Sequence, residues 1–108
     1  MIKSTAPRKI WLDHDQIVSA IVFHLIDEKW FAKDEIPQEL KNWIINQIPK
    51  NVKIPISRTR WETCQSGTRR MIWILVACGL DPYNICKYAS NAPAMHNRFK
   101  NIIDTLDN

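Results

Sequence analysis

The chain has 108 residues, of which 45% are hydrophobic and 24% are charged, and its formal net charge is +4. This composition is typical of one small globular domain and excludes a disordered chain. Only two glycines are present, which excludes a turn-rich β-sandwich and a glycine-rich phosphate loop, so we expect an all-α fold: a small single-domain bundle of about five helices.

The first predicted helix follows a short basic arm. We expect residues 1–9 to form this flexible arm and residues 10–108 to form a single helical domain. Asp13 and Gln16 have the spacing of a capping box, and apolar residues recur at helical spacing after them. The sequence therefore predicts a helix over about 14–31.

A second helix is predicted over about 37–48. Pro37 suits the first position of a helix, where no N–H group is needed, and Pro49 ends the apolar stripe. Downstream, Pro49 and Pro55 forbid a continuous helix, while apolar residues alternate with others. We expect an extended connector here, or at most a short edge strand.

Two more helices are predicted after this connector. Ser57 can cap a short one, and Thr68 is expected to cap another over about 69–78. Gly79 then ends this helix in the left-handed conformation that glycine adopts easily. A buried β-strand over 72–76 is the alternative, because β-branched residues dominate that stretch.

The last two predicted helices resemble a helix-turn-helix at a coarse level. Asp81 and Pro82 start the first of them, and the second runs over about 93–106 after a turn near residues 91–93. Pro93 departs from the pattern, because glycine usually makes this turn. The resemblance implies a DNA-binding motif whose last helix faces the nucleic acid.

On the surface of that last helix, three side chains are candidates for nucleic-acid contacts. Asn and Arg are the residue types that read the edges of adenine and guanine, and Lys contacts phosphates. The candidates are Asn97, Arg98 and Lys100.

The basic stretch, residues 50–70, is the most informative segment. It holds six cations against one acid, and hydroxyl and amide donors are interleaved with them. Guanidinium groups and short donors of this kind are what phosphate contacts use, although a charge run is also typical of a merely solvated face. The predicted nucleic-acid-binding residues here are Lys50, Lys53, Arg58, Arg60, Trp61, Ser66, Thr68, Arg69 and Arg70.

Two features of the basic stretch each have two possible interpretations. Trp61 can stack on a base or cap the core beneath the cations, and we favour the core role. Residues 66–68 precede a predicted helix whose first N–H groups point outward and would seat an anion. Arg69 and Arg70 in the first turn oppose the helix dipole, a conflict that a bound anion would relieve and that the fold can also simply tolerate.

Neither a metal site nor a catalytic constellation is expected. Asp13, His14, Asp15 and His24 are candidate metal ligands, but ligands that share a helix face need a spacing of three or four residues, and the two histidines are ten apart. Cys64 lies among arginines that would favour a reactive thiolate, yet a nucleophile also needs a base held beside it. We therefore expect a protein that is not an enzyme and that needs no cofactor.

The cysteine count and the hydropathy pattern indicate a soluble, cytoplasmic protein. Three cysteines without C-x-x-C spacing do not make a disulfide framework, and a reducing compartment suits them. The longest apolar run, residues 71–78, has eight residues against the roughly 20 that span a bilayer. We expect free cysteines and no membrane partner.

Together these features predict a small nucleic-acid-binding protein, either regulatory or a subunit of a nucleoprotein complex. Its arginines would contact phosphates, and the helix-turn-helix would supply base contacts. The alternative is a small inhibitor of the kind that phages or mobile elements encode, which binds and blocks a protein complex that itself handles nucleic acid. Such an inhibitor would use the same cations, or Trp61 as an aromatic anchor.

Overall fold

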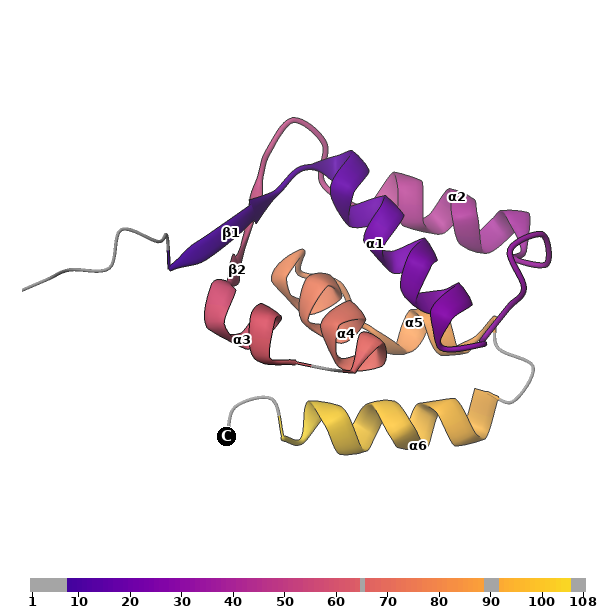
Figure 1. Ribbon diagram of the computed structural model, residues 1–108. Coiled ribbons are helices and arrows are strands. Elements are labelled where there is room, and N and C mark those ends of the chain that lie inside the picture. Colours follow the sequence, from indigo (N-terminus) through magenta and orange to yellow (C-terminus); the bar gives the residue numbers. More distant parts are fainter. Residues whose placement is uncertain (1–7, 65, 89–91, 106–108) are drawn as a thin grey trace, which may run out of the picture.

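Helices make up most of the computed structural model, which describes residues 8–64, 66–88 and 92–105 (Figure 1). The elements in chain order are β1 (Lys9–Leu12), α1 (His14–Asp27), α2 (Gln38–Gln47), β2 (Ile54–Ser57), α3 (Arg58–Thr63), α4 (Gly67–Ala77), α5 (Tyr83–Cys86) and α6 (Ala92–Ile103). Predictions about residues 1–7 and about the turn at 89–91 concern residues outside this description. The mostly helical fold is confirmed, but a small sheet is present as well. No helix within the described ranges is long and apolar enough to cross a membrane.

The sheet consists of two antiparallel strands that are distant in sequence, β1 and β2. Leu12 lies opposite Ile54, and both side chains pack against the core. Strand β2 confirms the short edge strand expected in the connector. Strand β1 has no counterpart among the predicted elements and overlaps the predicted arm at Lys9, which is paired with Ser57.

The starts of the helices follow local side-chain chemistry. The Asp13 carboxylate accepts the Gln16 N–H at 2.8 Å and the Gln16 amide oxygen accepts the Asp13 N–H at 2.9 Å, which confirms the capping box of α1. Pro37 occupies the cap of α2 with a ψ of 139°, so this helix begins one residue later than expected. The cap of α4 is Ser66 and not Thr68, which lies inside the first turn.

Two helices end in Schellman motifs, one with glycine and one without. Gly79 has a φ of 77° after α4, which confirms the predicted end of that helix. Lys29 takes the same role after α1 with a φ of 62°, and the Trp30 N–H donates to the Leu25 carbonyl at 2.9 Å. Helix α1 therefore ends at Asp27, earlier than predicted, because no glycine marks this position.

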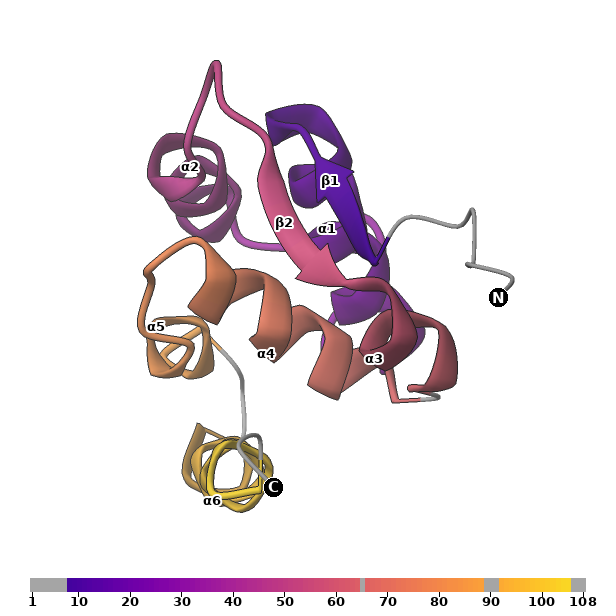
Figure 2. The same ribbon diagram turned by 90° about the vertical axis from the view of Figure 1, so that its left-hand side faces the viewer.

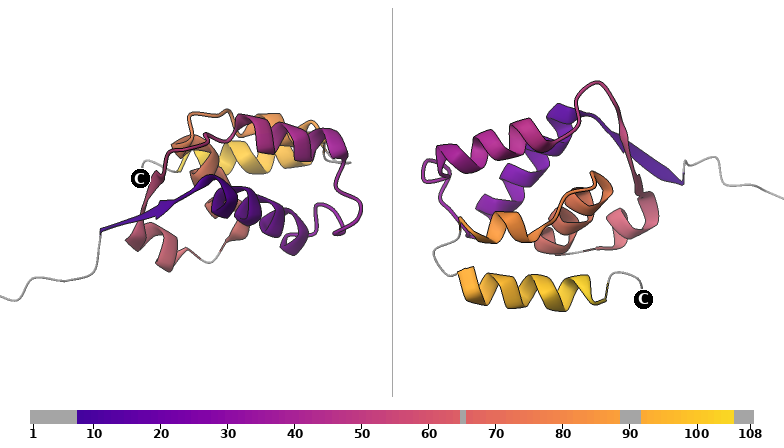
Figure 3. Two further views of the ribbon diagram at one scale, coloured as in Figure 1. Left: turned by 90° about the horizontal axis from the view of Figure 1, so that it is seen from above. Right: turned by 180° about the vertical axis from the view of Figure 1, so that it is seen from behind.

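The core lies where α1, α2 and α4 meet, and α6 runs along its far side (Figure 3). Residues 72–76 are helical, so the strand alternative for this stretch is wrong. The fully buried side chains include Ile17, Ile21 and Leu25 of α1, Leu40 and Ile44 of α2, Met71, Ile72, Ile74 and Leu75 of α4, and Phe99 of α6. Phe99 anchors α6, because its ring centroid lies 5.2 Å from that of Trp30.

Of the two C-terminal helices, α6 lies close to its predicted range, whereas α5 is short. The Asp81 carboxylate accepts the Tyr83 N–H at 3.0 Å, as a helix start requires, but α5 has only four residues. Tyr83 also stacks on His96 of α6, with 4.3 Å between ring centroids. Because the connecting turn lies outside the described residues, the helix-turn-helix stays a prediction.

Candidate nucleic-acid interface

Two arginines of the basic stretch have partners near the surface. Arg58 pairs with Glu62 one turn later on α3, with 2.8 Å between Nε and Oε1. Arg69 of α4 donates from Nη2 to the Thr105 hydroxyl at 3.3 Å. Exposed contacts of this kind contribute at most about 1 kcal/mol each. A phosphate can therefore compete for both arginines.

Arg70 is held more firmly, against Trp61. Its guanidinium donates to the Trp61 carbonyl and lies over the indole, 4.9 Å from the ring centroid. Trp61 in turn packs against the core, which agrees with the favoured role for this residue. Recruiting Arg70 to a phosphate would break both contacts, so it is a weak candidate for that role.

The N-terminus of α4 is occupied by a carboxylate of the chain itself. Glu28 follows α1, and its Oε1 accepts the Thr68 N–H at 3.2 Å, while Oε2 lies 3.5 Å from Arg98 Nη2. Gly67 makes room for this approach, since a Cβ there would lie 3.0 Å from Glu28 Oε1. Glu28 is therefore the anion that the helix dipole favours here, which corrects the expectation of an external one.

The other predicted contact residues differ in exposure. The Ser66 hydroxyl accepts the Arg69 N–H at 3.3 Å, and Thr68 is fully buried, so both serve the start of α4. Asn97 and Lys100 are exposed on α6. Their contacts to nucleic acid stay predictions.

The fold gathers the cations in a way that sequence order does not show. Strands β1 and β2 and helix α3 lie together at the end of the molecule that faces the viewer in Figure 2, and the loop before β2 stands above them. This basic end, residues 8–12 and 50–63, holds six Lys and Arg and one Glu, hence +5. The other described residues hold eight Lys and Arg against nine Asp and Glu, hence −1. The net charge of the described chain therefore resides at the basic end.

The outer face of the sheet within the basic end comprises Lys9, Trp11, Pro55 and Ser57. In the antiparallel register Lys9 lies opposite Ser57 and Trp11 lies opposite Pro55. Trp11 is 54% exposed. Sequence reasoning missed this face, because a strand as short as β1 is recognised only beside its partner. The alternation of outward and inward side chains along both strands is the pattern that identifies it.

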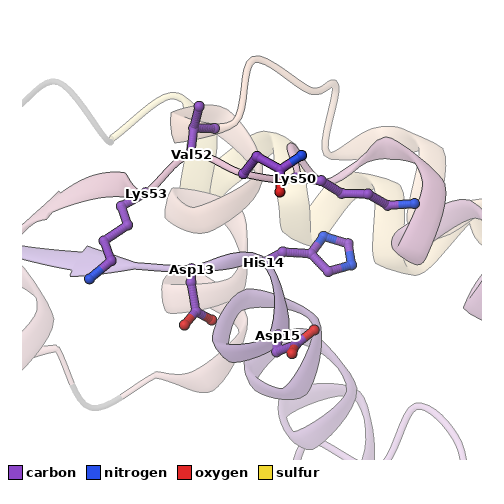
Figure 4. A pocket seen from close by; sticks show the side chains of 7 residues that line it. Asp13, His14, Asp15, Lys50, Val52 and Lys53 are labelled. Carbon is purple, nitrogen blue, oxygen red and sulfur yellow. The ribbon is translucent and has the colours of Figure 1, made fainter.

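A pocket of about 480 Å³ borders the basic end where α1 begins (Figure 4). It is lined by Asp13, His14, Asp15, Lys50, Asn51, Val52 and Lys53. Its two lysines and two aspartates balance in charge, and Asp13 already caps α1. Among the described residues, no group of three or more His, Cys, Asp and Glu side chains is placed to hold a metal ion. The pocket therefore favours neither a phosphate nor a metal.

A second hollow, the α1–α3 groove, has a volume of about 600 Å³ and is lined by residues that include Phe23, His24, Trp61 and Arg70. Phe23 is 59% exposed. Burial, together with the nearby Arg70 cation, lowers the pKa of His24 below its usual value, so the imidazole is neutral near pH 7. Phe, Trp and Arg side chains are enriched at the cores of protein interfaces.

The cysteines have the environment of structural residues. All three are free, and Cys64 is buried with its thiol donating to the Ser66 carbonyl at 3.4 Å. Burial raises the pKa of the Cys78 thiol and raises the pKa of Cys86 to about 11. Cys78 and Cys86 are therefore protonated at neutral pH and poor nucleophiles.

Comparisons with protein-family models, with curated proteins and with solved structures find no match for this chain. Two surfaces of the described chain are candidates for contact with a partner. The basic end combines the net charge with the exposed indole of Trp11. The α1–α3 groove combines an exposed phenyl ring with Trp61 and Arg70.

Proposed function

We propose that this chain is a small nucleic-acid-binding protein, regulatory or part of a nucleoprotein complex, that binds phosphates with the basic end. The observation that supports this most is the division of charge, +5 on the basic end against −1 on the other described residues. A charge separation of this kind attracts polyanions over a distance and orients the protein as it approaches them.

Three cations of the basic end are the proposed primary phosphate contacts: Lys9, Lys53 and Arg60. All three are exposed, and within the described part of the chain no ion pair holds them. Each phosphate that a cation neutralises releases counterions, which adds roughly 0.7–0.9 to the slope of log K against log salt concentration. Three contacts predict a slope of about −2 to −3. Arg58 adds a fourth contact if it leaves Glu62.

Fluorescence anisotropy with labelled oligonucleotides, between about 50 and 200 mM salt, tests this proposal. Replacing both Lys53 and Arg60 with Ala should weaken binding to all sequences and flatten the slope by roughly 1.4–1.8, at roughly 0.7–0.9 per contact. The charge-matched control replaces Lys33 and Lys87, exposed lysines outside the basic end, and should change binding much less. Equal losses in the two double variants, or no binding by the wild-type protein, would contradict the proposal.

A second candidate is the inhibitor function, and the α1–α3 groove supports it. Phe23 is 59% exposed beside Trp61 and Arg70, and aromatic and Arg side chains dominate the binding energy at protein interfaces. The partner would be a protein complex that handles nucleic acid, and the basic end would enter a site made for phosphate. Phe23→Ser should then prevent capture of that complex from a host lysate, whereas Ile45→Ser, at an exposed position outside the groove and the basic end, should not. The reverse pattern would rule out the groove as the anchor.

A further inference from the structure

The outer face of the sheet presents one exposed aromatic ring, that of Trp11. Its indole is 54% exposed and lies opposite Pro55. The neighbours of Trp11, Ile10 and Leu12, point to the other side, because side chains alternate along a strand. Leu12 packs against the core on that side. The core therefore does not need the Trp11 ring to fill it.

One cation shares the outer face with this ring, and a second precedes the neighbouring strand. Lys9 shares the outer face two residues before Trp11, about 7 Å away along β1. On the neighbouring strand, Lys53 directly precedes β2, and Ser57 stands opposite Lys9 as a hydroxyl donor. A flat ring with one cation on its own face and a second just before the neighbouring strand matches the chemistry of a nucleotide chain, in which flat bases are attached to charged phosphates.

We propose that the outer face of the sheet binds a single strand of nucleic acid, DNA or RNA, with an unpaired base stacked on Trp11 and the adjoining phosphates on Lys9 and Lys53. This inference rests on the proposed function of the basic end. Only a single strand offers the face of a base, because in a duplex the faces are covered by neighbouring pairs and only the edges line the grooves. Every base has a π-face, so this contact confers little sequence preference.

Anisotropy with a labelled single strand of about 12 nucleotides, as DNA and as RNA, and with the matching DNA duplex tests the inference. The wild-type protein should bind one or both single strands more tightly than the duplex. Trp11→Ala should weaken single-strand binding roughly 5- to 150-fold and change duplex binding less than about twofold, because the duplex offers no base to stack. Comparing the affinities for the DNA strand and the RNA strand shows which of the two nucleic acids the outer face binds.

Two further variants separate stacking from a loss of structure. Ile45→Ala removes another exposed apolar side chain, outside the basic end and the α1–α3 groove, and should leave both affinities unchanged. Trp11→Phe keeps a ring on the sheet and should retain part of the single-strand affinity. In addition, a single strand should quench the tryptophan fluorescence of the wild-type protein more than that of Trp11→Phe, because only the former carries the stacked indole. These two measurements decide the question even if Trp11→Ala does not fold.

The outcomes distinguish this inference from the function on which it rests. Equal affinity for single strand and duplex would overturn the stacking on Trp11 while phosphate binding by the basic end is retained. Equal losses for both ligands in folded Trp11→Ala, or identical quenching in the wild type and Trp11→Phe, would overturn it in the same way. No binding to any of the three ligands would overturn both.

Discussion

Glu28 connects three helices through one carboxylate, and its replacement should destabilise the fold more than the loss of a surface charge does. It follows α1, accepts the Thr68 N–H in the first turn of α4 at 3.2 Å, and lies 3.5 Å from Arg98 of α6. Its side chain is only 23% exposed. Glu28→Ala leaves the first turn of α4 without this acceptor and Arg98 without this partner.

The expected loss follows from these contacts. A hydrogen bond to a charged group contributes about 1.5–3 kcal/mol, an anion at a helix N-terminus about 0.3–1 kcal/mol, and an exposed ion pair up to about 1 kcal/mol. These contributions describe overlapping interactions of one carboxylate, so they do not add in full. We expect Glu28→Ala to lower the free energy of unfolding by about 1.5–3 kcal/mol. Glu28→Gln keeps an acceptor and should lose roughly half as much.

Urea unfolding followed by circular dichroism measures these differences. Glu62→Ala is the matched control, because it removes an exposed pair with Arg58 within one helix and should cost less than about 1 kcal/mol. Glu28→Ala also vacates the N-terminus of α4, so added sulfate should stabilise this variant more than the wild-type protein. A Glu28→Ala variant as stable as Glu62→Ala, with no extra response to sulfate, would refute the role of Glu28 at the start of α4.

Further predictions concern the helix ends and one buried histidine. Gly79→Ala should destabilise by about 1 kcal/mol, because a φ of 77° strains an L side chain although a Cβ would meet no atom within 4 Å. Lys29→Gly should stabilise the protein by roughly 0.5–1 kcal/mol, because it relieves the same strain at a φ of 62°. The urea midpoints of unfolding of the two variants measure both effects. Burial, and to a smaller extent the Arg70 cation, lowers the pKa of His24 in the folded protein, so the imidazole binds a proton more readily in the unfolded chain. The contribution of His24 to the free energy of unfolding is therefore full above the unfolded pKa of about 6.5 and is lost as the pH falls through the folded pKa. The stability difference between wild type and His24→Asn should therefore change between about pH 7.5 and pH 5.5; a constant difference would contradict this.

The features that the sequence predicts correctly are those decided by neighbouring residues. Asp13 and Gln16 cap α1 because their side chains need to reach only three residues along the chain. Gly79 ends α4 because a left-handed residue is needed there and glycine supplies it. The apolar periodicity of α1 is strong enough to show which of its faces is buried.

The features that sequence reasoning missed depend on contacts between distant residues. The position of Glu28 at the start of α4 joins residues 40 apart, and its approach to Arg98 joins residues 70 apart. Local chemistry shows only that the helix start can accept an anion. The charge of the basic end is likewise dispersed along the chain, because β1 brings Lys9 beside Ser57 only after the sheet has formed.

The salt dependence of single-strand binding, measured for the wild-type protein and for a variant with Lys9, Lys53 and Arg60 all replaced by Ala, tests phosphate binding by the basic end most directly. We expect a slope of log K against log salt of about −2 to −3 for the wild type, and binding by the triple variant that is weak and nearly independent of salt. Circular dichroism should show the same helical content in both, because all three side chains are exposed. A triple variant that binds with the affinity and slope of the wild type would show that the phosphates contact some other surface.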